Sequence, residues 1–384
     1  MDFKHFKRLS HAVKTGPAFF VTTIVLFCLC NAGLSVYGSD FGPLCNICVS
    51  RWKQGEKIFH TDSRWLGGDG AASVDLGNGR VLWLFGDSFI DTTGSGTRRG
   101  STLIRNSVAI QSGYDPSHAS MVFTWRTKNG KPSAFFKGRD GTWFWPASGI
   151  MIKKHLLIFL FEARTAQNAL GFETVGWKAV WVANPFAPPG RWTLTHLKSP
   201  QKQGLLVGSG RPIIENGFLY AFATDSRNRS VYLARWPEEK AAAGILTMPQ
   251  WWGGKKAGWL DHRTCKTNLA PLFTGGQTEF GVEYLRAQKR YVIIQTLSIT
   301  NPCLAILNAP AITGPWSTPA CFFRTPERDD PDLLIYAAKN HPSLHGADMI
   351  FTYMTNSTRT NRLLSDMAIY FPIMLKGHLC SRSP

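Results

Sequence analysis

Acidic residues are scarce in this 384-residue sequence. It has 25 Asp and Glu against 43 Lys and Arg, which gives a formal net charge of +18. The basic residues occur as singles and pairs, such as Arg98-Arg99 and Lys153-Lys154, and form no long tract or helical face. Net charge by itself governs steering and non-specific association. We therefore expect attraction to an acidic surface and no nucleic-acid partner.

The sequence also lacks the periodic patterns of fibrous proteins. Its 36 Gly and 22 Pro follow no triplet period, which excludes collagen, and no apolar heptad is sustained, which excludes a coiled coil. Charged residues make up 18% and hydrophobic residues 44%, so the chain can bury a core and is not disordered. Two aromatic residues are unusually abundant, with 14 Trp and 25 Phe.

The first 38 residues have the order of a secretory leader. Four basic residues between Lys4 and Lys14 precede an uncharged stretch whose apolar centre is 18–30. The apolar run is also just long enough for an uncleaved anchor. We expect 1–38 to be a signal peptide or membrane anchor, with 15–38 as the tether in the second case. The protein would then be secreted or periplasmic, or held at a membrane by its N-terminus.

Eight cysteines are present, and Cys28 and Cys30 lie in the leader. Cys45 and Cys48 have the spacing of a zinc half-site, but no second C-x-x-C and no H-E-x-x-H completes a metal set. In an oxidising compartment a disulfide, or a thiol pair without catalytic role, is the better interpretation. Cys303 and Cys321 flank a turn rich in Pro and Gly and could close it.

Beyond Cys48 the apolar runs are short and bounded by turns, which is typical of β-strands. Asn78-Gly79 and Asn216-Gly217 supply the positive φ that tight hairpins require. Only Pro237–Gly244 has a helical pattern, and it is too short to connect parallel strands. Val81–Phe85 is apolar on both faces, so such strands must lie between layers. These features predict an all-β fold, a β-propeller over 39–384.

Polar and aromatic segments recur ahead of the expected strands, and their number predicts five blades. They are Gly67–Gly70, Trp143–Pro146, Gly208–Arg211, Gln277–Phe280 and Tyr336–Pro342. In a propeller the first strand of each blade lines the central channel, so one polar group per blade would converge at one mouth. The expected groups are Asp69, Trp145, Arg211, Glu279, and Tyr336 or His341.

The densest motif runs from Gly68 to Ile90 and carries Asp69 and Asp87 at the two ends of one expected hairpin. Because the chain turns at Asn78-Gly79, the two carboxyls would meet at one edge, whereas Asp75 could not join them. Two carboxyls in one cleft separate their pKa values, which suits acid/base cleavage of a glycosidic bond. The alternative is that each Asp only caps backbone amides in a turn.

Six residues are candidates for substrate binding around this pair. Trp145 could stack on a sugar ring, whereas Trp83 lies in mid-strand and belongs to the core. Arg105 and Asn106 could bond hydroxyls or orient a carboxylate, or lie in a solvated loop. Arg211 and Glu279 would face the channel, and Glu283 would share the face of Glu279 deeper in. His341 could bond a hydroxyl, or only pack in a turn.

A rival interpretation starts from Phe85–Asp91, which resembles the first sequence block of the GDSL esterases and lipases, with Ser88 as nucleophile. That mechanism requires a His, oriented by an Asp, within reach of the serine. Beyond the leader, the only Asp-x-x-His spacing is Asp115 to His118, which comes far too early in the chain. The esterase fold also needs helices that this sequence lacks, so the esterase remains the weaker alternative.

The chain resembles a secreted five-bladed β-propeller family in several segments. They are Asp69–Ile90, Arg105–Ser107, Trp145-Pro146 and Tyr336–Pro342, together with Tyr353 and Asn356. That family began as a domain of unknown function and includes the endo-D-arabinanases that cut mycobacterial arabinan. The resemblance spans about 55–360 and is specific only around Asp69 and Asp87. It implies that these two carboxylates are catalytic, in an inverting hydrolase.

We therefore expect a glycoside hydrolase that cleaves an extracellular or cell-envelope polysaccharide, with an arabinan-like chain as the leading substrate. The alternatives are a glycan-binding propeller without catalysis and the Ser88 esterase. No cofactor and no metal in the site are expected, although a structural calcium in the central channel remains open. A monomer is expected, with polysaccharide as its partner.

Overall fold

The computed structural model describes residues 47–168, 171–201, 204–263, 269–298 and 302–380. The expected leader and Cys45 lie outside the described residues. No helix in the described ranges is both long and apolar enough to span a bilayer. The α-helices are short, with four to six residues each: α1 (Lys53–Glu56), α2 (Glu238–Ala242), α3 (Gly254–Ala257) and α4 (Thr360–Ser365).

Most of the described chain forms antiparallel sheets, five of which have four or more strands. The first contains β3 (Ala72–Gly77), β4 (Arg80–Phe85), β7 (Ser107–Ser112) and β8 (Ser120–Thr124). The second contains β11 (Thr142–Ile152), β12 (His155–Thr165), β13 (Phe172–Val182) and β14 (Leu194–Leu197). The third contains β15 (Leu205–Val207), β16 (Ile213–Glu215), β17 (Phe218–Asp225), β18 (Val231–Pro237), β19 (Gln250–Trp252) and β20 (Trp259–Asp261).

The fourth sheet contains β21 (Gly281–Leu285), β22 (Arg290–Thr296), β23 (Cys303–Ala309) and β24 (Ala320–Arg324). The fifth contains β25 (Leu333–Asn340), β26 (Met349–Ser357), β27 (Ile373–Leu379) and β1 (Ile47–Arg51). Two small sheets complete the set: β2 (Trp65–Gly68) with β5 (Ser88–Ile90) and β6 (Thr102–Ile104), and β9 (Arg126–Lys128) with β10 (Lys131–Ser133). The expectation of a chain built from antiparallel β-sheets is confirmed.

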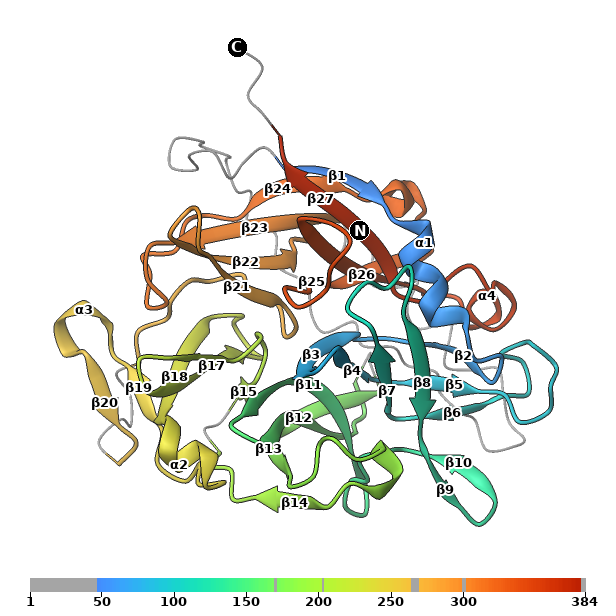
Figure 1. Cartoon of the computed structure of the whole chain (residues 1–384), viewed down its shortest axis with the longest axis horizontal. Coiled ribbons are helices and arrows are strands. Elements are labelled where there is room, and N and C mark those ends of the chain that lie inside the picture. Colours follow the sequence, from blue (N-terminus) through green and yellow to red (C-terminus); the bar gives the residue numbers. More distant parts are fainter. Residues whose placement is uncertain (1–46, 169–170, 202–203, 264–268, 299–301, 381–384) are drawn as a thin grey trace.

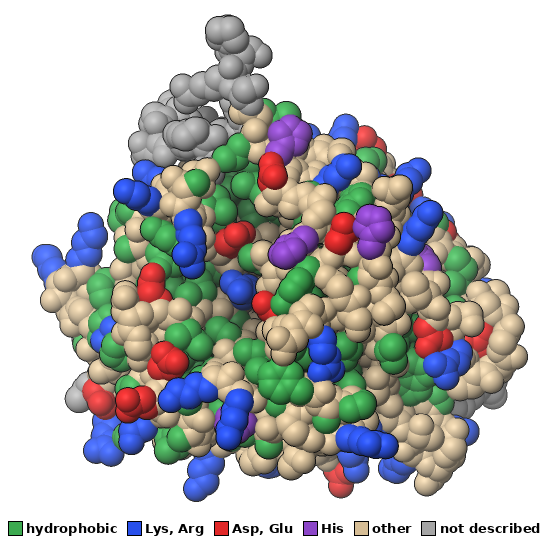
Figure 2. Space-filling view, viewed as in Figure 1, with side chains coloured by type: hydrophobic (Ala, Val, Ile, Leu, Met, Phe, Trp, Pro, Cys, Tyr) green, Lys and Arg blue, Asp and Glu red, His purple; other side chains and the backbone are tan. Residues whose placement is uncertain are grey.

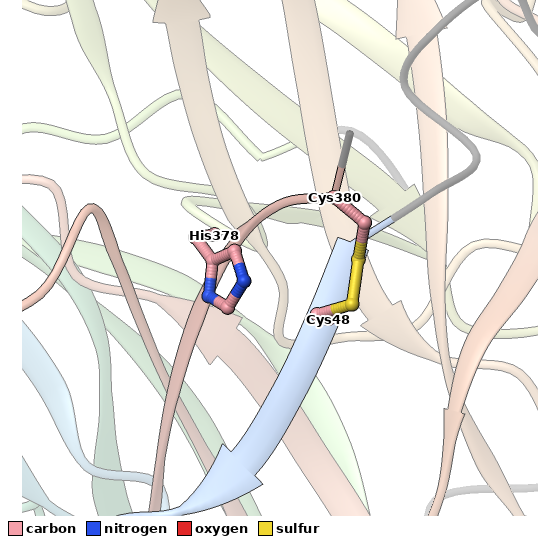
Figure 3. A group of neighbouring side chains, drawn as sticks. All are labelled: Cys48, His378 and Cys380. Atoms are coloured by element: carbon pink, nitrogen blue, oxygen red, sulfur yellow. A yellow bond between two sulfur atoms is a disulfide. The ribbon is translucent and has the colours of Figure 1, made fainter. Parts of the chain in front are cut away.

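The large sheets follow one another around a common centre, in a propeller-like arrangement (Figure 1). Strands β3, β11, β15, β21 and β25 lie nearest to that centre (Figure 1). Strand β1, from the start of the described chain, pairs with β27 and so closes the ring. Cys48 in β1 forms a disulfide with Cys380, just after β27, and reinforces this closure (Figure 3).

The structure tests the predicted turns, the buried strand and the short helix directly. Asn78 and Asn216 adopt φ of 54° and 48° in the β3–β4 and β16–β17 turns, as tight hairpins require. Val81–Phe85 is fully buried in β4, which explains its apolar residues on both faces. The short helix expected at Pro237–Gly244 is α2. Trp143–Pro146 and most of Tyr336–Pro342, however, lie within β11 and β25 instead of ahead of them.

Cysteine pairing is partly as expected. Cys303 and Cys321 form a disulfide between β23 and β24, which confirms the predicted closure. The predicted pairing of Cys45 with Cys48 is wrong, because Cys48 is bonded to Cys380. The two disulfides indicate an oxidising compartment, as an extracellular location requires.

Candidate active site

Asp69 and Asp87 meet at one end of the first sheet, as the hairpin predicted. Asp69 follows β2, and Asp87 lies between β4 and β5. The backbone N–H of Asp69 donates to the Asp87 carbonyl at 3.3 Å, and the N–H of Gly86 donates to the Asp69 carbonyl at 2.9 Å. The backbone therefore holds both residues together before any side-chain contact is considered.

The Asp69 carboxyl is completely buried and has few stabilising partners. Its Oδ2 accepts hydrogen bonds from the hydroxyls of Tyr336 (3.1 Å) and Tyr370 (3.3 Å). Its Oδ1 has no hydrogen-bond partner among the described residues. Burial, together with the negative charges of Asp87 and Glu279, raises the pKa of Asp69 well above its usual value. Asp69 is thus suited to hold a proton.

Asp87 is also buried, but its carboxylate is directly stabilised. Nη1 of Arg105 lies 2.9 Å from Oδ2, and the indole Nε1 of Trp145 donates to Oδ1 at 2.7 Å. Burial raises the pKa of Asp87, and the charge and hydrogen bonds of Arg105 and Trp145 oppose that rise. The net pKa of Asp87 is still raised, but that of Asp69 is raised well above its usual value, so Asp87 is the better suited of the two to be the anion.

Gly86 leaves the space that Asp69 occupies. A Cβ placed on Gly86 would overlap Oδ1 of Asp69, because the two atoms would lie far closer than a carbon–oxygen contact allows. The glycine of the Gly86-Asp87 pair is therefore required for side-chain packing in the site.

Glu279 and Lys339 extend the buried charges toward the fourth and fifth sheets. Nζ of Lys339 lies 4.0 Å from Oε2 of Glu279 and donates to the carbonyl of Gly70. Burial lowers the pKa of Lys339, and Glu279 and Asp69 oppose that shift. The lysine thus places a cation beside the carboxyls and ties the Asp69-Gly70 turn to β25.

The partly exposed side of the site is formed by Arg105 and Trp143. The Arg105 side chain is 34% exposed, and its guanidinium carbon lies 4.2 Å from the centre of the Trp143 ring. Trp143 in turn packs edge-on against Trp145, with ring centres 5.6 Å apart. Arg105 therefore connects a surface-facing aromatic group with the buried Asp87 carboxylate.

Two predicted substrate-binding residues have structural roles instead. Asn106 is fully buried, its amide donates to the carbonyls of Phe136 and Phe144, and its Oδ1 accepts from the N–H of Phe136. His341 is 1% exposed, and its ring nitrogens lie 2.7 Å from the hydroxyls of Ser73 and Thr352. Because these bonds use the polar atoms of both side chains, neither is free to bind a sugar.

Among the described residues, no hydrogen bond or ion pair joins Arg211 to the aspartate pair, although the preceding Gly210 bridges to Phe280, next to Glu279. The carboxyl groups that act on its pKa are those of Glu283 and Asp75. Of the predicted substrate-binding residues, the structure brings Arg105, Trp145 and Glu279 to the aspartate pair.

The structure also adds two groups that were not selected from the sequence. Tyr370, in the loop after α4, donates to the Asp87 carbonyl at 3.1 Å in addition to its contact with Asp69. Lys339 lies inside the Tyr336–Pro342 segment, in which only Tyr336 and His341 were predicted to face the channel. No local motif marks Tyr370, whose contact with Asp69 spans 301 residues.

Ser88 has no catalytic partner in the described chain. It is completely buried, and its hydroxyl bonds to the Gly86 carbonyl (2.9 Å) and the Ser107 hydroxyl (2.8 Å). The described histidines do not contact it, and His118, which pairs with Asp115, is 84% exposed. The geometry therefore disfavours the esterase.

One group of three potential metal ligands occurs in the described ranges. Atoms of Cys48, His378 and Cys380 all lie within 4.8 Å of one another (Figure 3). Both sulfurs are joined in the disulfide, so neither is the thiolate that zinc requires. The group is remote in the fold from Asp69, because it lies at the outer strands of the fifth sheet.

Residues 53–371 match the family described as "Domain of unknown function (DUF5005)". This is most of the chain, which therefore belongs to that family. The curated proteins contain no match.

Among solved structures, the chain is similar to a protein of Bacteroides ovatus ATCC 8483 that is provisionally named a hydrolase. The TM-score is 0.70 and the sequence identity 14%, and the match covers 86% of this chain and 90% of that protein. At this identity the likeness concerns the fold alone. The catalytic domain of an alpha-L-arabinofuranosidase of Coprinopsis cinerea follows, with a TM-score of 0.46 at 11% identity, over 82% of this chain and 92% of its own. An exo-beta-1,3-galactanase of Phanerochaete chrysosporium also has a TM-score of 0.46 at 11% identity, over 81% of this chain and 60% of its own.

Proposed function

We propose that this protein is a glycoside hydrolase on a five-bladed β-propeller, formed by 39–384, that cleaves an extracellular or cell-envelope polysaccharide. One observation carries the proposal: two buried carboxyls lie together in environments that favour different protonation states. Asp69 has a strongly raised pKa and an oxygen without a hydrogen-bond partner among the described residues, whereas Arg105 and Trp145 stabilise the carboxylate of Asp87 and oppose the rise of its pKa. Pairs of this kind are how one site provides both an acid and a base near neutral pH.

In this proposal Asp69 is the general acid and Asp87 the general base. Asp69 gives its proton to the glycosidic oxygen as the bond from that oxygen to the anomeric carbon breaks. Asp87 takes a proton from the water that attacks the same carbon, which inverts its configuration. Both carboxyls regain their starting protonation by exchange with solvent, so one water is consumed per bond cleaved.

The other side chains have supporting roles. Arg105 and Trp145 keep Asp87 ionised, and Tyr336 and Tyr370 orient the Asp69 carboxyl through Oδ2. Arg105 and Trp143, on the partly exposed side, are placed to contact the sugar next to the cleaved bond. Glu279 and Lys339 set the charge behind Asp69.

The first substrate to test is an arabinan, beside galactans and envelope glycans, with release of reducing ends as the readout. Asp69→Asn and Asp87→Asn should each remove turnover by several orders of magnitude while the protein remains folded. Asp140→Asn is the matched control, because Asp140 is exposed on a loop. Wild-type-like turnover in either site variant would refute the assignment.

A glycan-binding protein without catalysis is the second candidate. It is favoured by the burial of both aspartates, which are 0% and 2% exposed. This candidate predicts that polysaccharide is retained by the wild type and by both variants without release of reducing ends. The same panel therefore separates the two functions.

A further inference from the structure

Arg98 is a buried cation in a loop that is otherwise exposed. The loop joins β5 to β6, and its residues 92–97 and 99–100 face solvent, whereas Arg98 is 1% exposed. Most of the described Lys and Arg side chains lie at the surface, and Figure 2 shows them spread over one face of the molecule. Burying a guanidinium is costly unless its N–H donors are bonded. The position of Arg98 therefore indicates a specific role inside the protein.

The guanidinium of Arg98 binds two segments of backbone that are far apart in the sequence. One is β2, which leads directly into Asp69, and the other is α4 with the loop after it, which leads directly into Tyr370. Its hydrogen bonds to both segments go to backbone carbonyls. The acceptors are the carbonyls of Leu66 (2.8 Å from Nε), Leu363 (2.9 Å from Nη1), Asp366 (2.8 Å from Nη1) and Ile369 (bonded to Nη2). Arg98 thus joins the backbone before Asp69 to the backbone before Tyr370.

Tyr370 has a backbone conformation that must be held in place by its surroundings. Its φ is 65°, in the left-handed region that an aromatic residue rarely adopts. Such conformations cluster at functional sites and persist where the surrounding contacts fix them. Here Arg98 bonds to the Ile369 carbonyl, in the peptide before Tyr370, and the Tyr370 N–H donates to the Thr355 carbonyl at 3.1 Å. These bonds direct the Tyr370 hydroxyl to Oδ2 of Asp69.

The two segments are also packed directly against each other around Arg98. Gly67 in β2 has φ of 115°, and a Cβ placed on it would overlap the carbonyl oxygen of Tyr370. The guanidinium carbon of Arg98 lies 5.8 Å from the ring centre of Phe89, 5.7 Å from that of Tyr370 and 5.4 Å from that of Phe371. Aromatic rings and carbonyls therefore enclose the guanidinium, and the Tyr370 ring is part of that enclosure.

We propose that Arg98 is a positioning residue, which fixes the backbone on both sides of the Asp69–Tyr370 contact and so holds the Tyr370 hydroxyl on Asp69. Burial raises the pKa of Asp69, and the hydrogen bonds of Tyr336 and Tyr370 oppose that rise. A general acid is most effective when its pKa lies near the working pH, so a fixed Tyr370 hydroxyl keeps Asp69 able to release its proton. The catalytic meaning of this inference rests on the proposed function, whereas the effect on Asp69 is measurable without substrate.

The test is a ¹³C NMR titration of the Asp69 carboxyl in the full-length protein, with its signal assigned by its loss in Asp69→Asn. Tyr370→Phe removes the hydroxyl and should move the ionisation of Asp69 to higher pH. Arg98→Lys keeps the cation but lacks the planar fork that reaches both segments, so Asp69 should shift in the same direction. In the double variant, Arg98→Lys should add nothing to the effect of Tyr370→Phe, because the hydroxyl through which it acts is absent. Arg99→Lys, at the exposed neighbouring position, is the control and should leave Asp69 unchanged.

Hydrolysis kinetics give a second readout. Arg98→Lys should lower kcat by roughly 10- to 100-fold, as misplacement of a catalytic group implies, with KM unchanged because Arg98 and Tyr370 are both buried. A wild type without hydrolase activity would refute the proposed function and leave the titration valid.

Three results would overturn the role of Arg98. The first is an Asp69 carboxyl that titrates in Arg98→Lys as in the wild type, and the second is a full additional shift in the Tyr370→Phe background. If Arg98→Lys does not fold, Arg98→Gln, which keeps two N–H donors, is titrated in its place. Loss of folding in both variants is the third, because Arg98 would then support the whole fold and not the position of Tyr370.

Discussion

The indole Nε1 of Trp145 donates a hydrogen bond of 2.7 Å to Oδ1 of Asp87. Trp145 belongs to the second sheet, whereas Asp87 lies just after β4 of the first sheet. The contact therefore joins two sheets and stabilises an anion at the same time. In the proposed mechanism this bond keeps the general base ionised.

Trp145→Phe should weaken the base without removing the aromatic ring. Loss of the N–H removes one of the two hydrogen-bonded groups that lower the pKa of Asp87, so that pKa rises. We expect the acidic limb of the pH–rate profile to move to higher pH. Trp143→Phe is the control, because Nε1 of Trp143 has no partner among the described residues. Identical profiles for the Trp145 variant and the wild type would contradict this role.

Asp69→Asn should stabilise the fold at neutral pH. Because the folded-state pKa of Asp69 is raised, the folded protein holds this proton at pH values where the unfolded chain has released it. Stability is therefore lost as pH rises from about 3.8, the unfolded value, toward the folded pKa, with a slope of about 1.4 kcal/mol per pH unit. Denaturant unfolding between pH 4 and 8 should show that the variant lacks this loss. An unchanged pH dependence in the variant would show that Asp69 titrates normally.

His341 should control acid stability and not activity. Burial lowers the pKa of His341 to about 3, whereas the unfolded value is about 6.5. The unfolded chain thus binds this proton first, and stability falls as pH drops from about 6.5 toward 3. His341→Gln should reduce that fall relative to wild type, and His118→Gln, at an exposed position, should not. A change in turnover of the His341 variant beyond that of the His118 variant would mean that it contacts substrate after all.

Gly86→Ala should impair the site through packing. The added methyl group would overlap Oδ1 of Asp69, so the carboxyl must move. We expect a stability loss of about 1–3 kcal/mol, as for other overpacked positions, and a larger relative loss of turnover. Gly190→Ala is the control, because a Cβ added to Gly190 would meet no atom within 4 Å. Full activity in the Gly86 variant would show that the Asp69 position is not critical.

Loss of the Cys48–Cys380 disulfide should open the ring. The bond spans 332 residues, and the double alanine variant should lose about 2–4 kcal/mol of unfolding free energy. The Cys303–Cys321 bond spans only 18 residues, so its removal should cost less if disulfides act by limiting chain entropy. Denaturant titrations of both double variants without reductant give the comparison. An equal or smaller loss for the first pair would mean that β1 holds the ring without its disulfide.

The aspartate pair was predictable because its determinants are local. Asn78-Gly79 forces the hairpin, and the equal length of its two arms returns Asp87 to Asp69. The tyrosines were not predictable in the same way, because Tyr336 and Tyr370 reach Asp69 across 267 and 301 residues. Such contacts depend on how the ring closes, for which the sequence contains no local signal.

The roles of Asn106 and His341 were misjudged for a related reason. A polar side chain beside an expected site can face the substrate or satisfy buried backbone and hydroxyl groups, and the sequence does not distinguish these. Asn106 bonds to the backbone around Phe136, and His341 bridges Ser73 and Thr352.

The most direct test of the division into acid and base is a ¹³C NMR titration of the aspartate carboxyls, with signals assigned by Asp69→Asn, Asp87→Asn and Asp140→Asn. We predict that Asp69 takes up its proton at a clearly higher pH than Asp87. If Asp69 and Asp87 instead ionise together, or Asp87 takes up its proton at the higher pH, the two carboxyls do not differ as the proposed acid and base must, and the proposed chemistry is contradicted.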